Sequence, residues 1–368
     1  MGSYFKPNSG TTYTLDDLLF GDAGKISIDS GTTSESLAEA KRISANTSDK
    51  AYRRLTASGN VTSYSKLAAF HKCPRAYELD QLDANSPHHV ESDIVNLDFA
   101  FGHSVGAGIQ TYAATRSLVA AQFAAFVAWK ADWDAEKTDN KGNPKGKSLT
   151  WAQVAVEKFG YFYQRELTDF EVVTLPNGKP ATELSFAIDM ENGFYHFGHI
   201  DTLLQSKSTG RLAVWEGKTT GFESVDEALY ANSSQALSYS VVVDAIAKTL
   251  NCSGTDYEVI YVVYSSATRD FQLLPFGKTR TQRAEWLQDV LLDHASIKQY
   301  ETIKFYPKRG ESCFNSSFKS RCKHFGNCTM SNGALHPSTV VKQLETIEDV
   351  EAVDFKFTLS ELIAAQKG

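Results

Sequence analysis

The sequence predicts an α/β fold in which a central mixed β-sheet is flanked by helices, with further helices added before the sheet. With 368 residues, 42% of them hydrophobic and 22% charged, the chain has the composition of a folded globular protein and not of a disordered chain or coiled coil. Apolar residues recur at helical spacing up to about residue 167, whereas short alternating or apolar runs begin at residue 181. The order from there is β-β-β-α-β-β-α, as expected for a sheet covered by helices.

The first half of the chain predicts a polar arm followed by helices. Residues 1–60 are rich in Ser, Thr, Gly and Asp and contain few apolar clusters, so we expect an extended or partly ordered N-terminal arm. Helices are expected over 63–82, interrupted at Pro74, and over 97–136 and 151–167. Gly, Pro, Asn and Lys in 137–148 predict an exposed loop between the last two helical stretches.

The second half predicts the sheet itself. Three strands joined by short turns are expected over 181–190, 194–206 and 211–220. A long helix, two strands and a further helix follow, over 226–250, 257–267, 271–276 and 281–301. Residues 336–368 contain an acidic stretch and are expected to form a C-terminal tail that either contacts a partner or is simply solvated.

Charge and sorting signals narrow the class of protein. The net charge of −7 argues against a protein that coats nucleic acid generally, although a local basic groove remains compatible with it. The sequence shows neither an apolar run of membrane-spanning length nor the pattern of a signal peptide, so we expect a cytoplasmic protein without a membrane partner. Thiols stay reduced in that compartment, which makes metal or cluster ligation the alternative to disulfides for the five cysteines.

Two neighbouring predicted strands carry a group of charged residues. Asp201 lies in Gly-His-Ile-Asp on one strand, and Glu216 and Lys218 lie in Trp-Glu-Gly-Lys on the next. Because residues two apart on a strand share a face, Glu216 and Lys218 should point the same way, with Asp201 beside them and Glu183 on the preceding strand. Two carboxylates and an ammonium suit a site for Mg²⁺ or Mn²⁺. The alternative is a solvated sheet face, but the apolar residues around both motifs favour a buried position.

The motifs together resemble those of the PD-(D/E)XK nuclease superfamily, in its RecB/AddB-like branch. Glu183, the Gly198–Asp201 run, the Trp215–Lys218 run, and Gln235 with Tyr239 follow one another in that family's order over about 60 residues. The resemblance implies a restriction-endonuclease-like core over 61–335 with a helical insertion at about 103–167. It also implies Asp201 and Glu216 as metal ligands, Lys218 as the catalytic lysine, Gln235 and Tyr239 on a helix flanking the site, and Glu183 as a possible further ligand.

The function that this resemblance implies is metal-dependent DNA cleavage, most naturally as an exonuclease in recombination, repair or phage DNA processing, the last placing the protein in the host cytoplasm. The expected partner is DNA, as ends or single strands, and a protein partner stays open. Aromatic residues near lysines suit single strands, though core packing explains the aromatics equally well: Trp129, Trp133, Tyr161, Phe162 and Tyr163 beside Lys130, Lys137, Lys141, Lys145 and Lys147. The alternative is a non-catalytic module of the same fold that binds DNA ends.

Four cysteines form a second pattern. One cysteine, Cys73, precedes the predicted core, and Cys313, Cys322 and Cys328 follow it. This arrangement resembles the iron–sulfur nucleases of the same branch, including CRISPR-associated RecB-like exonucleases, and implies a [4Fe–4S] cluster that joins the N- and C-terminal parts. The spacing C-x₈-C-x₅-C is wider than the usual C-x₂-C-x₅-C, so zinc remains an alternative, either on the four cysteines or locally with His324 in place of Cys73.

One residue of the family pattern is missing. Related enzymes begin an early helix with Gly-x-x-Val-His, whose histidine joins the metal ligands, whereas this chain has Gly106 in the histidine position after Gly102 and Val105. His103 lies three residues earlier, on the same face if the helix has begun. Water or His103 is therefore expected to take the place of the missing ligand.

Overall fold

The computed structural model describes residues 31–46, 60–84, 96–250, 252, 257–315, 320–325, 328 and 354–367. Its centre is a mixed eight-stranded sheet with the order β12-β5-β6-β7-β8-β9, in which β1 and β4 pair with other parts of β6. The bounds are β1 Val61–Thr62, β4 Phe170–Val172, β5 Thr182–Asp189, β6 Tyr195–Ser206, β7 Leu212–Thr220, β8 Tyr257–Ser265, β9 Asp270–Lys278 and β12 Phe355–Thr358. The predicted α/β class with a central mixed sheet is confirmed, and it fits a restriction-endonuclease-like fold.

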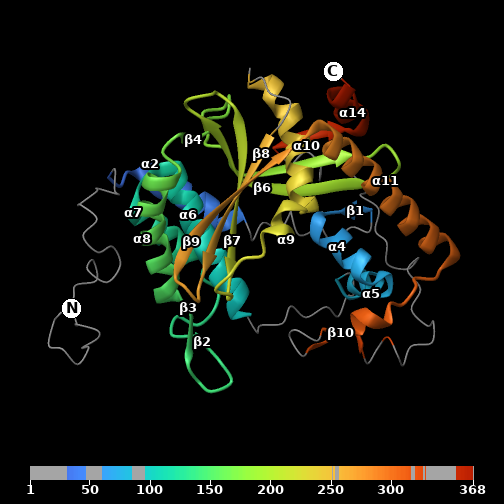
Figure 1. Ribbon diagram of the computed structural model, residues 1–368, viewed down its shortest axis with the longest axis horizontal. Coiled ribbons are helices and arrows are strands. Elements are labelled where there is room, and N and C mark those ends of the chain that lie inside the picture. Colours follow the sequence, from blue (N-terminus) through green and yellow to red (C-terminus); the bar gives the residue numbers. More distant parts are fainter. Residues whose placement is uncertain are drawn as a thin grey trace.

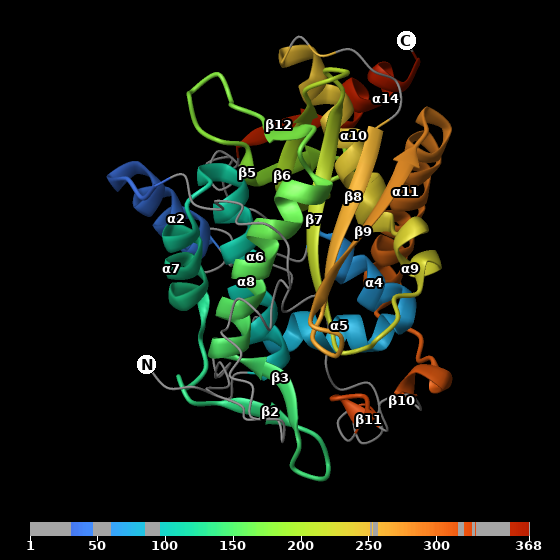
Figure 2. The ribbon, with the colours of Figure 1, turned by 60° about the vertical axis from the view of Figure 1, so that its left-hand side comes forward.

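Helices cover both faces of the sheet (Figures 1 and 2). One group comprises α6 Leu97–Thr115, α7 Leu118–Ala128 and α8 Leu149–Glu166, and the other comprises α4 Tyr64–Lys72, α10 Ser234–Thr249, α11 Arg280–Ile303 and α14 Leu359–Lys367. Each group forms its own apolar core against the strands. Trp215 of β7, for example, is fully buried and stacks on Phe159 of α8 with ring centroids 5.2 Å apart.

The strands that carry the charged motifs run as the predicted three-stranded meander. β5 pairs with β6 in antiparallel register along most of its length, from Thr182 opposite Thr202 to Asp189 opposite Tyr195. In contrast, β6 pairs with β7 only between Thr202 opposite Trp215 and Gln205 opposite Leu212. Beyond Thr202 and Trp215 the two strands separate, while β7 continues in parallel register with β8. The residues that follow, Asp201 and Glu216, therefore lie where the sheet opens.

Helix boundaries differ from the expected ones where a capping residue or a left-handed residue intervenes. The expected helix 226–250 is two helices, α9 Glu227–Ala231 and α10, because Asp226 caps the first and Ser233 begins the second. The stretch 97–136 divides into α6 and α7 at Arg116, whose φ of 57° ends α6. The break at Pro74 is confirmed, with α4 before it and α5 Pro74–Ala84 after it.

The segment 137–148 is largely exposed, as its composition predicts, but it is a hairpin and not a loop. It forms most of an antiparallel hairpin of β2 Glu136–Thr138 and β3 Pro144–Ser148 with an irregular register. The Lys137 and Lys147 side chains both bind Asp98 at the start of α6, and Lys147 is buried. Composition indicated a turn, but these ion pairs to a distant helix fix the hairpin.

Both ends of the chain contribute to the fold. The described part of the region expected to be a polar arm includes the helix α2 Ser34–Asn46, which packs on α6 and α7. At the other end, β12 pairs in parallel with β5, and Leu359 and Leu362 of α14 are buried in the core. Residues 336–353 of the expected acidic tail lie outside the described residues. In the described part of the chain, every helix is too short or too polar to cross a bilayer.

Candidate active site

The motif residues line one cavity of about 720 Å³ between α6 and α10. Asp201, Glu216 and Lys218 lie along its inner end, where β6 and β7 separate. The backbone N–H of Gly217 has no partner across the opened sheet and donates to Asp201 Oδ2 at 2.9 Å. That hydrogen bond holds the Asp201 carboxylate beside β7 in place of the missing strand pairing. The sheet opening thus creates the cavity and aims the acidic side chains into it.

Lys218 is held by its neighbours on two elements. Its Nζ donates to Glu216 Oε1 at 2.5 Å and to Gln235 Oε1 at 3.1 Å. Gln235 Nε2 in turn donates to the hydroxyl of Tyr239 at 2.6 Å, one turn further along α10. Burial alone would lower the pKa of Lys218, but the charges of Glu216 and Asp201 outweigh it and raise that pKa. The lysine is therefore a fixed, charged donor at neutral pH.

The pKa values of two carboxyl groups of the site, Asp201 and Glu183, are raised. Burial raises the pKa of Asp201 well above its ordinary value, and the charges of Glu216 and Glu183 raise it further. The pKa of Glu183 is raised by burial and by the charge of Glu216. Glu216 is buried, and its Oε2 atom has no hydrogen-bond partner among the described residues. The raised pKa values of Asp201 and Glu183 mean that added positive charge, such as a bound cation, would favour the ionised form of these carboxylates.

These residues fit a divalent oxygen-liganded cation held by few protein ligands. No three or more of the His, Cys, Asp and Glu side chains that the structure describes converge closely enough to form a complete metal cage. Mg²⁺ does not require one, because it keeps several waters and is commonly bound through one or two carboxylates together with phosphate oxygens. The unpartnered Glu216 Oε2 and the nearby Asp201 carboxylate supply that donor set.

The early helix borders the cavity as the motif comparison expects. A Cβ atom placed on Gly106 would meet nothing within 4 Å, so the position of the missing histidine is open space. His103 also lines the cavity, but its side chain is exposed, and partial burial together with the charge of Lys130 lowers its pKa. One residue that the sequence analysis missed is Gln110, a buried side chain hydrogen-bonded to Glu183. Its position one helical turn after Gly106 was the available signal.

Most of the aromatic residues considered for DNA contact are buried, and the exposed aromatic residues at the cavity are others. Trp129, Phe162 and Tyr163 are buried in the core of the α6–α8 group, and Tyr161 packs against it. The core interpretation therefore holds for them, because their helices bury that face. Trp133 is exposed. The exposed aromatics at the cavity are instead Tyr64 and Phe99, with 39% and 67% of their surface accessible.

The family profile that matches this chain is that of the PD-(D/E)XK nuclease superfamily, over residues 61–323, more than half of the sequence. The chain belongs to this superfamily. A comparison with curated proteins found no match. The PD-(D/E)XK enzymes are mostly metal-dependent nucleases and typically use Mg²⁺ or Mn²⁺. The superfamily assignment confirms the broad resemblance derived from the motifs, and the matched span includes every residue of the carboxylate–lysine group.

The four cysteines of the second pattern lie where the segment after α11 returns to α4 and α5. Cys73 is buried between α4 and α5, and Cys313 ends the short helix η1 Gly310–Cys313. The N–H of Cys322 donates to the carbonyl of Cys313 at 2.8 Å, and Ser312 Oγ donates to the carbonyl of Lys72 at 2.5 Å. Partial burial raises the pKa of the Cys313 thiol, and the nearby thiols of Cys73, Cys322 and Cys328 raise it further. Among the described residues, no three or more His, Cys, Asp or Glu side chains are grouped closely enough to hold a metal ion.

Two other candidates have partners elsewhere. His324 Nε2 lies 2.5 Å from Asp80 Oδ1, so its ring is already engaged by a carboxylate of α5. Cys252, the fifth cysteine, accepts a hydrogen bond from Gln205 Nε2 at 3.4 Å and packs against the apolar core of the α4–α10 group.

Proposed function

We propose that this protein is a Mg²⁺- or Mn²⁺-dependent deoxyribonuclease that degrades DNA from strand ends. The observation that carries the proposal is the separation of β6 and β7, which leaves Asp201 and Glu216 facing one cavity beside Lys218. Membership of the PD-(D/E)XK superfamily supports phosphodiester hydrolysis as the chemistry. The RecB/AddB-like order of the motifs supports an exonuclease acting in recombination, repair or phage DNA processing.

Each motif residue has a role in this proposal. Asp201 and Glu216 would hold the cation, with Glu183 as a further carboxylate. When bound, Mg²⁺ or Mn²⁺ supplies a Lewis acid that polarises the phosphate. Lys218 stays protonated, so it donates hydrogen bonds that orient the attacking water and offset charge growing on the phosphate oxygens. Gln235 and Tyr239 fix the position of the Lys218 ammonium.

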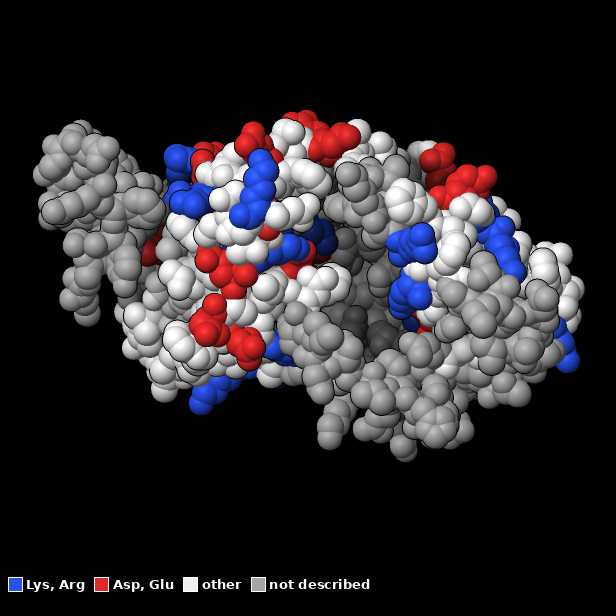
Figure 3. All heavy atoms as spheres, turned by 90° about the horizontal axis from the view of Figure 1, so that it is seen from below, with Lys and Arg blue, Asp and Glu red and all other residues white. Residues whose placement is uncertain are grey.

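The form of the cavity supports a single strand or a strand end as substrate. The acidic residues lie at the inner end of a pocket, so a phosphodiester must enter it to reach them. Tyr64 and Phe99 offer exposed rings on which unpaired bases can stack. Seen from below, this face is hollowed, and lysine or arginine side chains lie on both sides of the hollow (Figure 3). Basic groups there would attract the phosphate backbone despite the net negative charge.

The test is cleavage of end-labelled linear and circular DNA, single- and double-stranded, with Mg²⁺, Mn²⁺ or a chelator. We expect metal-dependent degradation of linear single strands and resistance of circular single strands. Lys218→Ala should abolish it, whereas Lys207→Ala, which removes an exposed lysine just after β6, should not. Folded wild-type protein that binds DNA ends without cleaving them under any of these conditions would instead establish the non-catalytic module.

We further propose that Cys73, Cys313, Cys322 and Cys328 hold a [4Fe–4S] cluster that joins the two chain ends. The hydrogen bonds that place Cys322 beside Cys313, and Ser312 beside the carbonyl of Lys72, support the set, and the Asp80 contact of His324 favours it over the local zinc site. Protein purified without oxygen should be brown and contain about four irons per chain. Stoichiometric zinc without iron would overturn the cluster, and Cys73→Ser would then show whether the zinc site includes the distant cysteine.

A further inference from the structure

The helix α2 lies outside the matched family region and yet forms part of the cavity wall. It precedes residue 61, where the family match begins. Ala40 and Ile43 are buried against alanines of α6 and α7, and Ile43 also lines the cavity that holds the acidic residues. Small side chains on all three helices allow this close approach. The helix thus precedes the matched region and packs directly beside the site.

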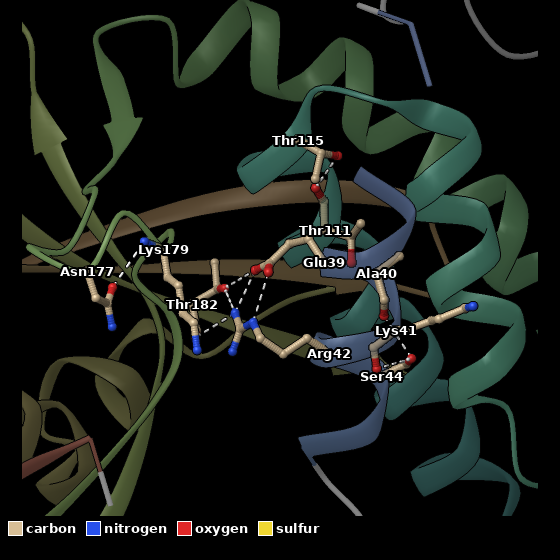
Figure 4. Close-up of polar contacts among 10 residues, drawn as sticks. All are labelled: Glu39, Ala40, Lys41, Arg42, Ser44, Thr111, Thr115, Asn177, Lys179 and Thr182. Atoms are coloured by element: carbon tan, nitrogen blue, oxygen red, sulfur yellow. Dashed lines mark hydrogen bonds and ion pairs between the residues drawn. The ribbon is translucent and has the colours of Figure 1, made fainter. Parts of the chain in front are cut away.

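One arginine of α2 reaches the sheet. Arg42 is held by Glu39 through two hydrogen bonds, Nε to Oε2 at 2.9 Å and Nη2 to Oε1 at 2.6 Å. Its Nη2 also donates to the carbonyl of Thr182 at 3.1 Å and to the Thr182 hydroxyl. That hydroxyl donates to Glu39 Oε1 at 3.0 Å, which closes the network (Figure 4). A planar guanidinium suits such a forked arrangement better than a lysine would.

The anchored residue directly precedes a site carboxylate in an unusual conformation. Glu183 has a φ of 50°, in the left-handed region that costs a non-glycine residue roughly 1–2 kcal/mol. Such a conformation persists only when its surroundings hold it. On one side Thr182 pairs with Thr202 of β6, and on the other it is bound by Arg42. The Glu183 side chain then lines the cavity with Asp201 and Glu216.

We propose that Arg42 is a positioning residue for the metal site. By holding Thr182, it keeps Glu183 in the left-handed conformation that directs its carboxylate toward Asp201 and Glu216. The helix α2 is then an integral part of the nuclease. This inference rests on the proposed function for the identity of the cation. A purely structural role for Arg42, as an anchor of α2, would act on stability alone.

The test measures Mn²⁺ binding to the DNA-free protein by titration calorimetry, alongside cleavage and thermal unfolding. Arg42→Met should weaken Mn²⁺ binding about 10–100-fold, the usual effect of losing a group that orients a ligand. Lys41→Met is the matched control, because it removes the same charge from an exposed neighbour that points away from the network, and it should bind as wild type (Figure 4). Thr182→Val removes only the hydroxyl contacts and should weaken binding in the same direction. If Arg42→Met does not fold, the Mn²⁺ affinity of Thr182→Val tests the proposal in its place.

A double variant separates positioning from general damage. If Arg42 acts through Glu183, Arg42→Met should add almost nothing to the loss that Glu183→Gln already causes. Wild-type Mn²⁺ affinity in Arg42→Met, or an equal loss in both backgrounds, would overturn the inference. Wild-type protein that binds Mn²⁺ without cleaving DNA overturns the proposed nuclease while this inference stands. Wild-type protein that binds no Mn²⁺ overturns both.

Discussion

Two buried polar clusters share strand β6, and they differ in how their charges are balanced. The carboxylate cluster, Asp201 with Glu183 and Glu216, places acidic groups together at the opening of the sheet. The histidine cluster lies toward α11, where Thr62 Oγ1 is 2.8 Å from Nε2 of His294 and 3.5 Å from Nδ1 of His196.

The buried rings of the histidine cluster are neutral and have their partners within the protein. Burial lowers the pKa of His196 to about 3 and that of His294 to about 4, so both rings are neutral at neutral pH. The His294 ring also stacks on Phe194, with centroids 4.5 Å apart. The carboxylate cluster, in contrast, keeps an unpartnered buried oxygen on Glu216. Buried groups that are neutral and bonded internally support the fold, whereas a buried charge that needs an outside partner indicates a site.

The largest effect should come from removing charge in the carboxylate cluster. We expect Asp201→Asn and Lys218→Ala each to lower the cleavage rate on the order of 10²–10³-fold or more, because Asp201 would hold the cation and Lys218 would act on the reacting phosphate. Asp201→Asn should leave the unfolding temperature of the metal-free protein equal or higher, since it relieves repulsion between buried carboxylates. Cleavage assays and thermal unfolding check both statements. A large loss of stability in Asp201→Asn would remove the contrast between the clusters.

The histidine cluster should control acid stability. The pKa of His294 falls from its ordinary value near 6.5 to about 4 on folding, so the unfolded state binds more protons between those values. Its contribution is complete above pH 6.5 and is lost as the pH falls toward 4, by about 1.4 kcal/mol per pH unit. Carboxylates with raised pKa act with the opposite sign, so the comparison needs a variant. The stability advantage of wild type over His294→Gln, measured by denaturant unfolding, should shrink across this window. A constant difference would show that His294 does not titrate as a buried neutral ring.

Elements that depend on local sequence patterns could be predicted, whereas elements that depend on contacts between distant residues could not. The meander of β5, β6 and β7 was predictable because alternation and turn residues are local signals. The same strands carry the acidic motifs, which is why the cavity residues could be named in advance. The hairpin of β2 and β3 was not predictable, since its lysines are fixed by Asp98 in a distant part of the chain.

The parts of the site that sequence reasoning missed depend on tertiary packing. The α2 helix is polar in composition, and Ala40 and Ile43 are the hydrophobic residues that it buries, so its role depends on where α6 and α7 place their alanines. Gln110 carries no signature by itself, and its meaning comes from the contact with Glu183. The core aromatics of α7 and α8 show the reverse case, in which a pattern suggestive of DNA binding is explained by burial.

Restoring the missing histidine should strengthen metal binding at the carboxylate cluster. A Cβ atom at Gly106 would meet nothing within 4 Å, and Gly106 lines the cavity, so a side chain can leave the helix there. We expect Gly106→His to tighten Mn²⁺ binding about tenfold, because an imidazole nitrogen would replace a water ligand. It should also stabilise α6 by only about 0.3 kcal/mol, because relative to alanine glycine costs about 1 kcal/mol in a helix interior and histidine up to about 0.7 kcal/mol. Calorimetric titration with Mn²⁺ and thermal unfolding measure the two effects. Unchanged affinity would place the metal out of reach of this helix.

The smallest effect should come from His103, the alternative ligand on the same helix. Its ring is exposed and lies near the Lys130 charge, which repels a cation as well as a proton. We therefore expect His103→Ala to leave the Mn²⁺ concentration for half-maximal cleavage within about twofold of wild type, well under the 1.4 kcal/mol of a tenfold change. A rise of tenfold or more, at unchanged thermal stability, would make His103 a ligand. It would also mean that the chain has moved the family histidine by three residues along α6, so that the carboxylate cluster already holds a nitrogen donor and Gly106→His gains nothing further.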